Sequence, residues 1–463
     1  MSKIFGHYVP FSIVLLAFAE FFIIYAAFYG GVAIRFADGS VGTELEYQLQ
    51  VKAFLFALSM FASMIAVGLY IRGTREGFSF VIVKLMVACV LAFFLLVALY
   101  YIVPSWFVGR GVFLLSILLS FIGLSASRYL YSHVINTNLI TTRILVIGTG
   151  QMAIQLKHLR RKSDWRGLTL VGFLHLKGDK DEVDENEIIR SPQSLTELVT
   201  EYGIDEIVVA IEEQRKNYPV DQIIECKMKG IRVTEICDFF ERHSGLIQID
   251  TLHPGRFIFI EGFQQSYFRN LLKRVVDITL SSLILIVTLP VYPILVLLIK
   301  RESGWSSPAF YQQTRIGQGE NKFNIYKFRS MVVNAESDGA QWAQKNDTRV
   351  TRIGKIIRKT RLDELPQLWN VLKGDMSFVG PRPERPEFVE ILAGKIPYYR
   401  MRHRVKPGIT GWAQVCYPYG DDAEDAKKKL QFDLYYIKNY SVFLDLTILA
   451  QTLQVILWQK GAR

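Results

Sequence analysis

Four span-length apolar stretches are the feature that most restricts how this chain can fold. They occupy roughly residues 8–34, 48–71, 78–103 and 107–127. Each stretch is long enough to cross a hydrocarbon core of about 30 Å as a helix. Soluble proteins rarely bury four helices of this apolarity in succession. The sequence therefore predicts a four-helix transmembrane bundle over residues 1–137.

The charges that flank these stretches predict how the bundle is oriented. Basic residues at Lys3, Arg72, Arg75, Arg128 and Arg143 fall on one side, and acidic residues at Asp38, Glu44 and Glu46 fall on the other. Because cytoplasmic loops carry an excess of Lys and Arg, both ends of the bundle should face the cytoplasm. Glu20 lies within the first stretch, where we expect it to reach water or a helix partner.

Composition narrows the kind of partner that the chain can have. Half of its 463 residues are hydrophobic, which excludes disorder, and the formal net charge is +11. A large fraction of hydrophobic residues together with an excess of Lys and Arg favours contact with membrane lipids whose headgroups are anionic. We therefore expect membrane lipids as partners and no nucleic acid.

A second domain begins where the apolar stretches end. Residues 143–153 are typical of a buried parallel strand, a glycine turn and a helix start, and further strands are expected at 168–174 and 206–211. This alternation predicts a Rossmann-like domain over residues 138–250. Ala153 replaces the third glycine of a dinucleotide-binding turn, and no acidic residue ends the second strand. We therefore favour an accessory role without a bound cofactor.

A fifth apolar stretch, residues 275–299, is interrupted by Pro290 and Pro293 and has basic residues at both ends. Two prolines and cytoplasmic flanks favour a helix that enters the membrane, bends and returns on the same side. A kinked span is the alternative, but it would place the following basic domain outside the cell. We predict a linker and re-entrant helix over residues 251–300, followed by an α+β cytoplasmic catalytic domain over 301–463.

The densest constellation of chemically active side chains lies at residues 349–375. At least six cations precede Asp363 and Glu364, which stand just before Pro366 at the expected start of a helix. Helix N-termini favour anionic groups and phosphates, although a lone aspartate here would more often only cap the helix. Among so many cations, the carboxylates could hold Mg²⁺ or attack phosphorus.

Four sequence blocks resemble the signatures of monotopic bacterial polyprenyl-phosphate phosphoglycosyl transferases and occur in the same order. They cover residues 327–331, 361–372, 379–383 and 406–411. The resemblance extends over about residues 266–463. The four spans and the Rossmann-like domain resemble the long form of that family, and residues 254–263 resemble its exopolysaccharide-initiating branch.

The resemblance implies a reaction in two steps. Asp363 would attack the β-phosphorus of a UDP-sugar, release UMP, and hold the sugar phosphate until undecaprenyl phosphate takes it. Glu364 would help to bind Mg²⁺ or manage protons, so both carboxylates are catalytic and metal-binding candidates. The candidates for substrate binding are Lys327, Arg329, Arg361, Pro381, Arg382, Pro383, Arg404 and Asp433.

The resemblance also implies a place for this reaction in the cell. The enzyme would lie in the bacterial inner membrane as a multi-pass protein, and a homodimer is expected for the long form. It would transfer a hexose 1-phosphate in the first membrane step of exopolysaccharide assembly.

Two other classes of protein compete with this interpretation. A membrane-bound NAD-dependent UDP-sugar dehydratase or epimerase would need a Tyr-x-x-x-Lys pair, and the chain contains none. A non-catalytic scaffold of an export complex would not need Asp363 and Glu364 among arginines. Activity alone separates the scaffold from the transferase.

Overall fold

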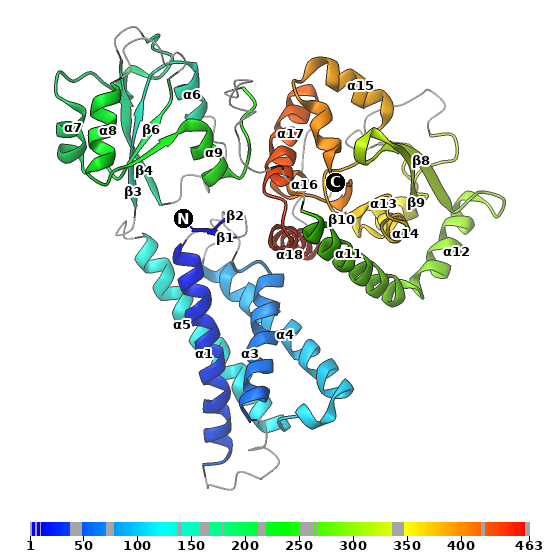
Figure 1. Ribbon diagram of the computed structural model, residues 1–463. Coiled ribbons are helices and arrows are strands. Elements are labelled where there is room, and N and C mark those ends of the chain that lie inside the picture. Colours follow the sequence, from blue (N-terminus) through cyan, green and yellow to red (C-terminus); the bar gives the residue numbers. More distant parts are fainter. Residues whose placement is uncertain are drawn as a thin grey trace. The chain divides into compact units, whose positions relative to one another are not determined.

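The computed structural model describes residues 2–4, 7–9, 11–37, 49–70, 78–136, 141–157, 167–176, 179–211, 219–250, 263, 266–335, 347–417 and 422–458 (Figure 1). Two short strands, β1 (Ser2–Ile4) and β2 (His7–Val9), lie at the start of the chain. Most of the chain divides into two compact units, residues 8–245 and residues 246–463. The segment 254–262, part of the block that suggested the exopolysaccharide branch, lies outside the described residues.

Four long apolar helices form the bundle of the first unit: α1 (Phe11–Arg35), α3 (Leu49–Ala66), α4 (Phe78–Ile102) and α5 (Arg110–Asn136). A short 3₁₀ turn, η1 (Pro104–Trp106), precedes α5. Each long helix contains a window apolar enough to cross a membrane. The predicted four-helix bundle is confirmed.

A buried ion pair joins α1 to α5. Nε of Arg128 lies 2.6 Å from Oε1 of Glu20, and the Tyr70 hydroxyl donates to Oε2 of Glu20 at 2.5 Å. Charges inside a membrane helix are paired because an isolated charge there is costly. The interpretation that Glu20 reaches a helix partner is confirmed. The sequence analysis placed Arg128 in a loop outside the apolar stretches. That prediction was wrong, because Arg128 lies within α5 and its guanidinium group pairs with Glu20.

The α/β domain has one parallel sheet in the order β5-β4-β3-β6-β7 (Figure 1). Its strands are β3 (Thr142–Ile147), β4 (Leu168–Leu174), β5 (Ile188–Ile189), β6 (Glu206–Val209) and β7 (Arg232–Glu235). Its helices are α6 (Gln151–Lys157), η2 (Glu185–Glu187), α7 (Leu195–Tyr202), α8 (Val220–Met228) and α9 (Ile236–Ser244). Numbered from the first strand of the domain, this order is 3-2-1-4-5, which matches five of the six strands of the Rossmann sheet, so the predicted class is confirmed.

The glycine turn of this domain contacts the domain's own chain. Gly148 has φ +111°, and a Cβ there would lie 2.6 Å from the carbonyl oxygen of Ala210. The Thr149 amide donates to Oδ2 of Asp179 at 3.3 Å, and the Glu182 amide donates to the Thr149 carbonyl at 2.9 Å. A carboxylate thus bonds an amide of the turn that would face a phosphate in a dinucleotide-binding domain. This contact favours the accessory role.

The first long helices of the second unit are two apolar helices, α11 (Tyr267–Thr288) and α12 (Val291–Ser303), which are bent by 61° relative to each other. The break falls at Leu289-Pro290, where proline removes a helical hydrogen bond. Several apolar side chains beside the break, such as Ile286, are largely exposed. The predicted bent helix is confirmed, and its return to the same side of the membrane stays a prediction.

The polar face of α11 is fixed to the rest of the second unit. Nζ of Lys273 bonds the Val379 carbonyl at 3.0 Å and lies 2.6 Å from Oδ2 of Asp445. Oδ1 of Asp277 accepts from the Phe378 amide at 3.0 Å. These buried bonds tie the apolar helix to β10 (Ser377–Val379), which leads directly into the Gly380–Pro383 segment.

Two small sheets form the frame around that segment. Strands β8 (Phe310–Ile316) and β9 (Lys322–Phe328) make an antiparallel hairpin around η3 (Gln318–Glu320), and β10 pairs in parallel with β11 (Gly408–Thr410). Gly380 and Gly408 allow the two chains to approach, since a Cβ on Gly408 would lie 2.1 Å from the Gly380 nitrogen.

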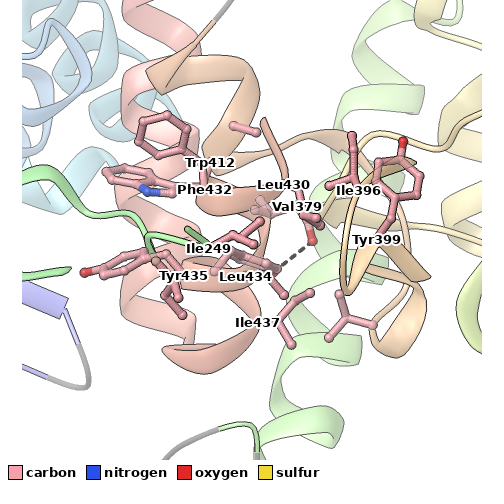
Figure 2. Close-up of a cluster of buried hydrophobic side chains, with 14 of the residues drawn as sticks. Ile249, Val379, Ile396, Tyr399, Trp412, Leu430, Phe432, Leu434, Tyr435 and Ile437 are labelled. Carbon is pink, nitrogen blue, oxygen red and sulfur yellow. Dashed lines mark hydrogen bonds between the residues drawn. The ribbon is translucent and has the colours of Figure 1, made fainter. Parts of the chain in front are cut away.

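The remaining helices surround these sheets and carry the core. They are α13 (Arg352–Lys359), η4 (Leu362–Glu364), α14 (Gln367–Lys373), α15 (Pro386–Lys395), η5 (Tyr399–Arg404), α16 (Trp412–Cys416), α17 (Ala423–Lys438) and α18 (Val442–Trp458). Figure 2 shows Leu434 and Tyr435 of α17 packed with Trp412 in the core cluster. Leu444 and Ile448 belong to the same cluster, so α18 helps to close this core.

Candidate active site

A tight turn between two helices presents the adjacent carboxylates. Arg361 has φ 60°, a left-handed conformation that ends α13, and η4 then carries Asp363 and Glu364 to the start of α14. Pro366 precedes α14 and cannot continue the earlier hydrogen bonding. Both carboxylates are buried, with 7% and 9% of their surface exposed. The prediction that they stand at a helix start is confirmed.

Two cations neutralise Glu364. Nζ of Lys327, on β9, lies 3.2 Å from Oε1 of Glu364, and Nη2 of Arg382 lies 3.1 Å from the same oxygen. Burial alone would raise the pKa of Glu364, but these two charges lower it below its usual range. Glu364 therefore stays ionised and holds both cations in place.

Asp363 has a different environment although it is the next residue. No described side chain or backbone amide donates a hydrogen bond to its carboxylate, which lines a cavity. Burial and the neighbouring negative charge of Glu364 raise the pKa of Asp363, while nearby cations oppose this shift. Asp363 is thus the carboxylate whose oxygens are open to a reacting group.

The cavity has a volume of about 420 Å³ and a strongly cationic wall. The basic residues that line it are Arg315, Lys327, Arg329, Arg349, Arg358, Arg382, Arg385, Arg402 and Lys429. Clustered guanidinium groups suit an anionic ligand, because arginine binds phosphate or carboxylate through two parallel hydrogen bonds.

The structure brings together part of the predicted site. Lys327, Arg329, Asp363 and Arg382 line the cavity, and Glu364 lies behind them as the partner of two cations. Pro381 and Pro383 are buried on either side of Arg382.

Three other predicted residues do not line this cavity. Arg361 and Arg404 are exposed, and the Arg404 carbonyl accepts a bond from Gln318 at 3.1 Å. Asp433 is buried on α17 and lies 2.9 Å from Nη2 of Arg402. Burial raises the pKa of Asp433 to about 6, against the opposing effect of Arg402. Among the described residues, Asp433 thus acts on an arginine of the wall and not on the cavity directly.

Arg402 is one of several cavity-lining residues, Arg315 among them, that the sequence analysis did not choose. It lies in the basic run 400–404, where Arg404 was chosen instead. In η5 the Arg402 side chain turns inward and is 6% exposed, whereas Arg404 faces outward. The run itself marked the segment, but only the direction of each side chain shows which arginine reaches the cavity.

A magnesium ion shared between the two carboxylates and a substrate stays a prediction; Asp363 lines the cavity, and Glu364 lies behind it with Oε1 bonded to Lys327 and Arg382. No group of three or more His, Cys, Asp or Glu residues able to hold a metal occurs in the part of the chain that the structure describes. Mg²⁺ commonly needs no such cage, because one or two carboxylates and substrate phosphates hold it. Asp363 and Glu364 would be its protein ligands here. A bound Mg²⁺ would neutralise phosphate charge.

Comparisons with known proteins agree with a phosphate-handling site. Residues 268–459 match the family model "Bacterial sugar transferase", and residues 66–225 match a model described as "CoA-binding domain". Among the relatives is the UDP-N-acetylgalactosamine-undecaprenyl-phosphate N-acetylgalactosaminephosphotransferase of Aeromonas hydrophila. The two chains are 45% identical over 238 residues, which are 51% of this chain and 55% of the relative.

Two further relatives extend the similarity toward the N-terminus. A UDP-glucose:undecaprenyl-phosphate glucose-1-phosphate transferase of Escherichia coli K12 is 33% identical over 311 residues, 66% of this chain and 65% of the relative. An uncharacterized sugar transferase of Haemophilus influenzae is 32% identical over 343 residues, 69% of each chain. The chain thus spans about half the length of the Aeromonas relative and about two thirds of the other two.

Proposed function

Because this chain belongs to the bacterial sugar transferases, we propose that it transfers a sugar 1-phosphate from a UDP-sugar to undecaprenyl phosphate and releases UMP. One observation carries the proposal: Asp363 is a buried carboxylate without a hydrogen-bond partner among the described residues, and it opens into a cavity walled by arginines. A nucleophile and the charges that neutralise its phosphate target are therefore in one place.

In the first step, an oxygen of Asp363 attacks the β-phosphorus of the UDP-sugar. The new bond joins this oxygen to phosphorus, and the bond from phosphorus to the bridging oxygen breaks. UMP leaves with the bonding electrons, and the sugar phosphate stays on Asp363 as an acyl phosphate. Arg382 and Lys327 fit the role of neutralising negative charge beside the reacting phosphate, because both side chains line the cavity.

In the second step, a phosphate oxygen of undecaprenyl phosphate attacks the phosphorus held on Asp363. The acyl phosphate bond breaks, Asp363 is regenerated, and the product is a sugar joined to the lipid through a diphosphate. The lipid substrate implies that the catalytic unit works at the membrane surface. We propose the cytoplasmic face of the inner membrane, as the first membrane step of exopolysaccharide assembly.

The sugar is the finer part of the proposal. We propose a hexose 1-phosphate, and the relatives from Escherichia coli and Xanthomonas campestris, both named for glucose, support it. An N-acetylated sugar is the second candidate. It is favoured by the relative from Aeromonas, which is 45% identical and is named for N-acetylgalactosamine.

The test is UMP release by the purified full-length protein with Mg²⁺, with and without undecaprenyl phosphate. The UDP-sugars are UDP-glucose, UDP-galactose, UDP-N-acetylglucosamine and UDP-N-acetylgalactosamine. Lipid-dependent UMP release with one hexose would support the proposal, and release only with an N-acetylated sugar would select the second candidate. Folded protein that releases no UMP from any of them would favour the scaffold.

A further inference from the structure

Three successive carbonyl groups around Arg382 are each held by a hydrogen bond. The Gly408 amide donates to the Pro381 carbonyl at 2.9 Å. Nη2 of Arg402 donates to the Arg382 carbonyl at 3.1 Å, and Nη1 of Arg315 donates to the Pro383 carbonyl at 3.1 Å. The two prolines fix their own φ angles, so these bonds leave the segment little freedom.

Arg402, on η5, is itself held by buried side chains. Nη1 of Arg402 donates to the Tyr399 hydroxyl at 2.6 Å, and its Nη2 lies 2.9 Å from Oδ2 of Asp433. Asp433 comes from α17, so α17 is linked through Arg402 to the backbone of Arg382. This chain of contacts ends on Glu364, which Arg382 reaches with Nη2.

Arg315, on β8, is also held by side chains of the protein. Nη2 of Arg315 donates to Oε1 of Gln313 at 2.6 Å, and its Nη1 lies 3.7 Å from Oε2 of Glu384. Arg315 on β8 and Arg402 on η5 therefore donate hydrogen bonds to the neighbouring carbonyl groups of Pro383 and Arg382.

Both arginines also line the cavity, so a direct contact with substrate is the competing explanation. The terminal nitrogens of both side chains already have protein partners. The remaining donor, Nε, is enclosed by protein in each case. A guanidinium bonded to protein at both terminal nitrogens is fixed in place and holds the backbone that it bonds, whatever ligand its remaining N–H groups meet.

We propose that Arg315 and Arg402 are positioning residues that fasten the backbone of Pro381–Pro383 and so aim the Arg382 guanidinium at Glu364 and the cavity. The predicted effect on turnover rests on the proposed function. The predicted fastening of the backbone rests only on the contacts described above. Preorganised donors that need not move during reaction are worth most when their supporting shell is rigid.

The fastening is tested first by amide hydrogen exchange, which needs no substrate. The reporters are Gly408 and Ile316, whose amides donate to the Pro381 and Glu384 carbonyls. Arg402→Gln and Arg315→Gln should each speed exchange at one or both reporters by about tenfold, because local opening becomes easier. Arg400→Gln is the matched control, since Arg400 lies on η5 but pairs with Glu320 and Glu390 at the surface.

Removing Arg402 alone would leave Asp433 buried without its partner, which can unfold the protein. The double variant Arg402→Gln with Asp433→Asn removes both charges, so that exchange can be measured in a protein without a buried unpaired carboxylate. Unchanged exchange at both reporters in this folded pair and in Arg315→Gln would overturn the proposal.

The effect on turnover is tested by a double-mutant cycle with Arg382→Lys, which keeps a charge. Arg402→Gln should lower kcat/KM by about tenfold in the wild type and by less than about threefold beside Arg382→Lys, because coupled residues are not additive. An equal loss of kcat/KM in both backgrounds would show that Arg402 acts independently of Arg382 and would contradict the proposal. If the wild type releases no UMP from any UDP-sugar, the proposed function fails, and the exchange result alone decides the fastening.

Discussion

The Lys327 ammonium lies 3.2 Å from Oε1 of Glu364, although the two residues are 37 positions apart in the chain. Arg382 approaches the same oxygen from a third segment. Glu364 is therefore the point at which β9, η4 and the segment after β10 are joined by charge. Its neighbour Asp363 is left open to the cavity.

The first prediction concerns this shared oxygen. Lys327→Met should lower kcat/KM by about 10²-fold or more, because one of the two neutralising charges is lost from a buried site. The control is Lys322→Met, an exposed residue on the same strand. Wild-type kcat/KM in a folded Lys327→Met protein would contradict the role given to Lys327.

The second prediction concerns the nucleophile. Asp363→Asn should abolish UMP release and leave the thermal unfolding midpoint close to that of the wild type, because Asp363 has no hydrogen-bond partner to lose among the described residues. Acid-quenched wild-type protein incubated with UDP-sugar alone should carry a sugar phosphate adduct by intact mass, and the variant should not. Asp375→Asn, which removes a carboxylate outside the cavity wall, is the control. Full turnover by Asp363→Asn would remove Asp363 from the mechanism.

The third prediction is a pH dependence. Burial and Glu364 raise the pKa of Asp363, and a nucleophilic carboxylate must be ionised. As pH falls through this raised pKa, Asp363 takes up a proton and kcat/KM should decline. The acid limb should therefore lie above the ordinary aspartate pKa of about 3.9. An acid limb at or below that value would show that a carboxylate with an ordinary or lowered pKa controls the step.

The fourth prediction concerns the α/β domain. Gly148→Val should destabilise this domain, since its Cβ would meet the Ala210 carbonyl and φ is +111°. Turnover per molecule of folded protein should stay within about twofold, because Gly148 and the catalytic cavity belong to different compact units and share no packing partner in the described residues. The check is UMP release together with thermal unfolding. Loss of turnover in a well-folded variant would mean that the domain is more than an accessory.

The fifth prediction concerns the bent pair α11–α12. If the pair re-enters the membrane, the catalytic unit lies on the cytoplasmic side with both ends of the bundle. In a cysteine-free background, Lys322→Cys should resist a membrane-impermeant maleimide in intact cells and react after permeabilisation. Thr43→Cys, in the acidic loop of the sequence, should react in intact cells. Labelling of Lys322→Cys from outside would instead indicate a broken fifth span.

Local patterns were enough to predict much of the fold. Strand Leu168–Leu174 and helix Val442–Trp458 have the bounds expected from the sequence. The four apolar helices followed from the length and apolarity of their stretches. Asp363 and Glu364 could be found because proline and adjacent carboxylates mark a helix start.

The sequence by itself determined the four spans, the parallel α/β domain and the carboxylate pair, because apolar periodicity and turn residues act over short distances along the chain. Tertiary structure decided that Arg128 pairs with Glu20, that Arg402 and not Arg404 enters the cavity wall, and that Asp433 holds Arg402. These pairings join residues far apart in sequence. They depend on which side chains turn inward when the elements pack, and no local pattern carries that information.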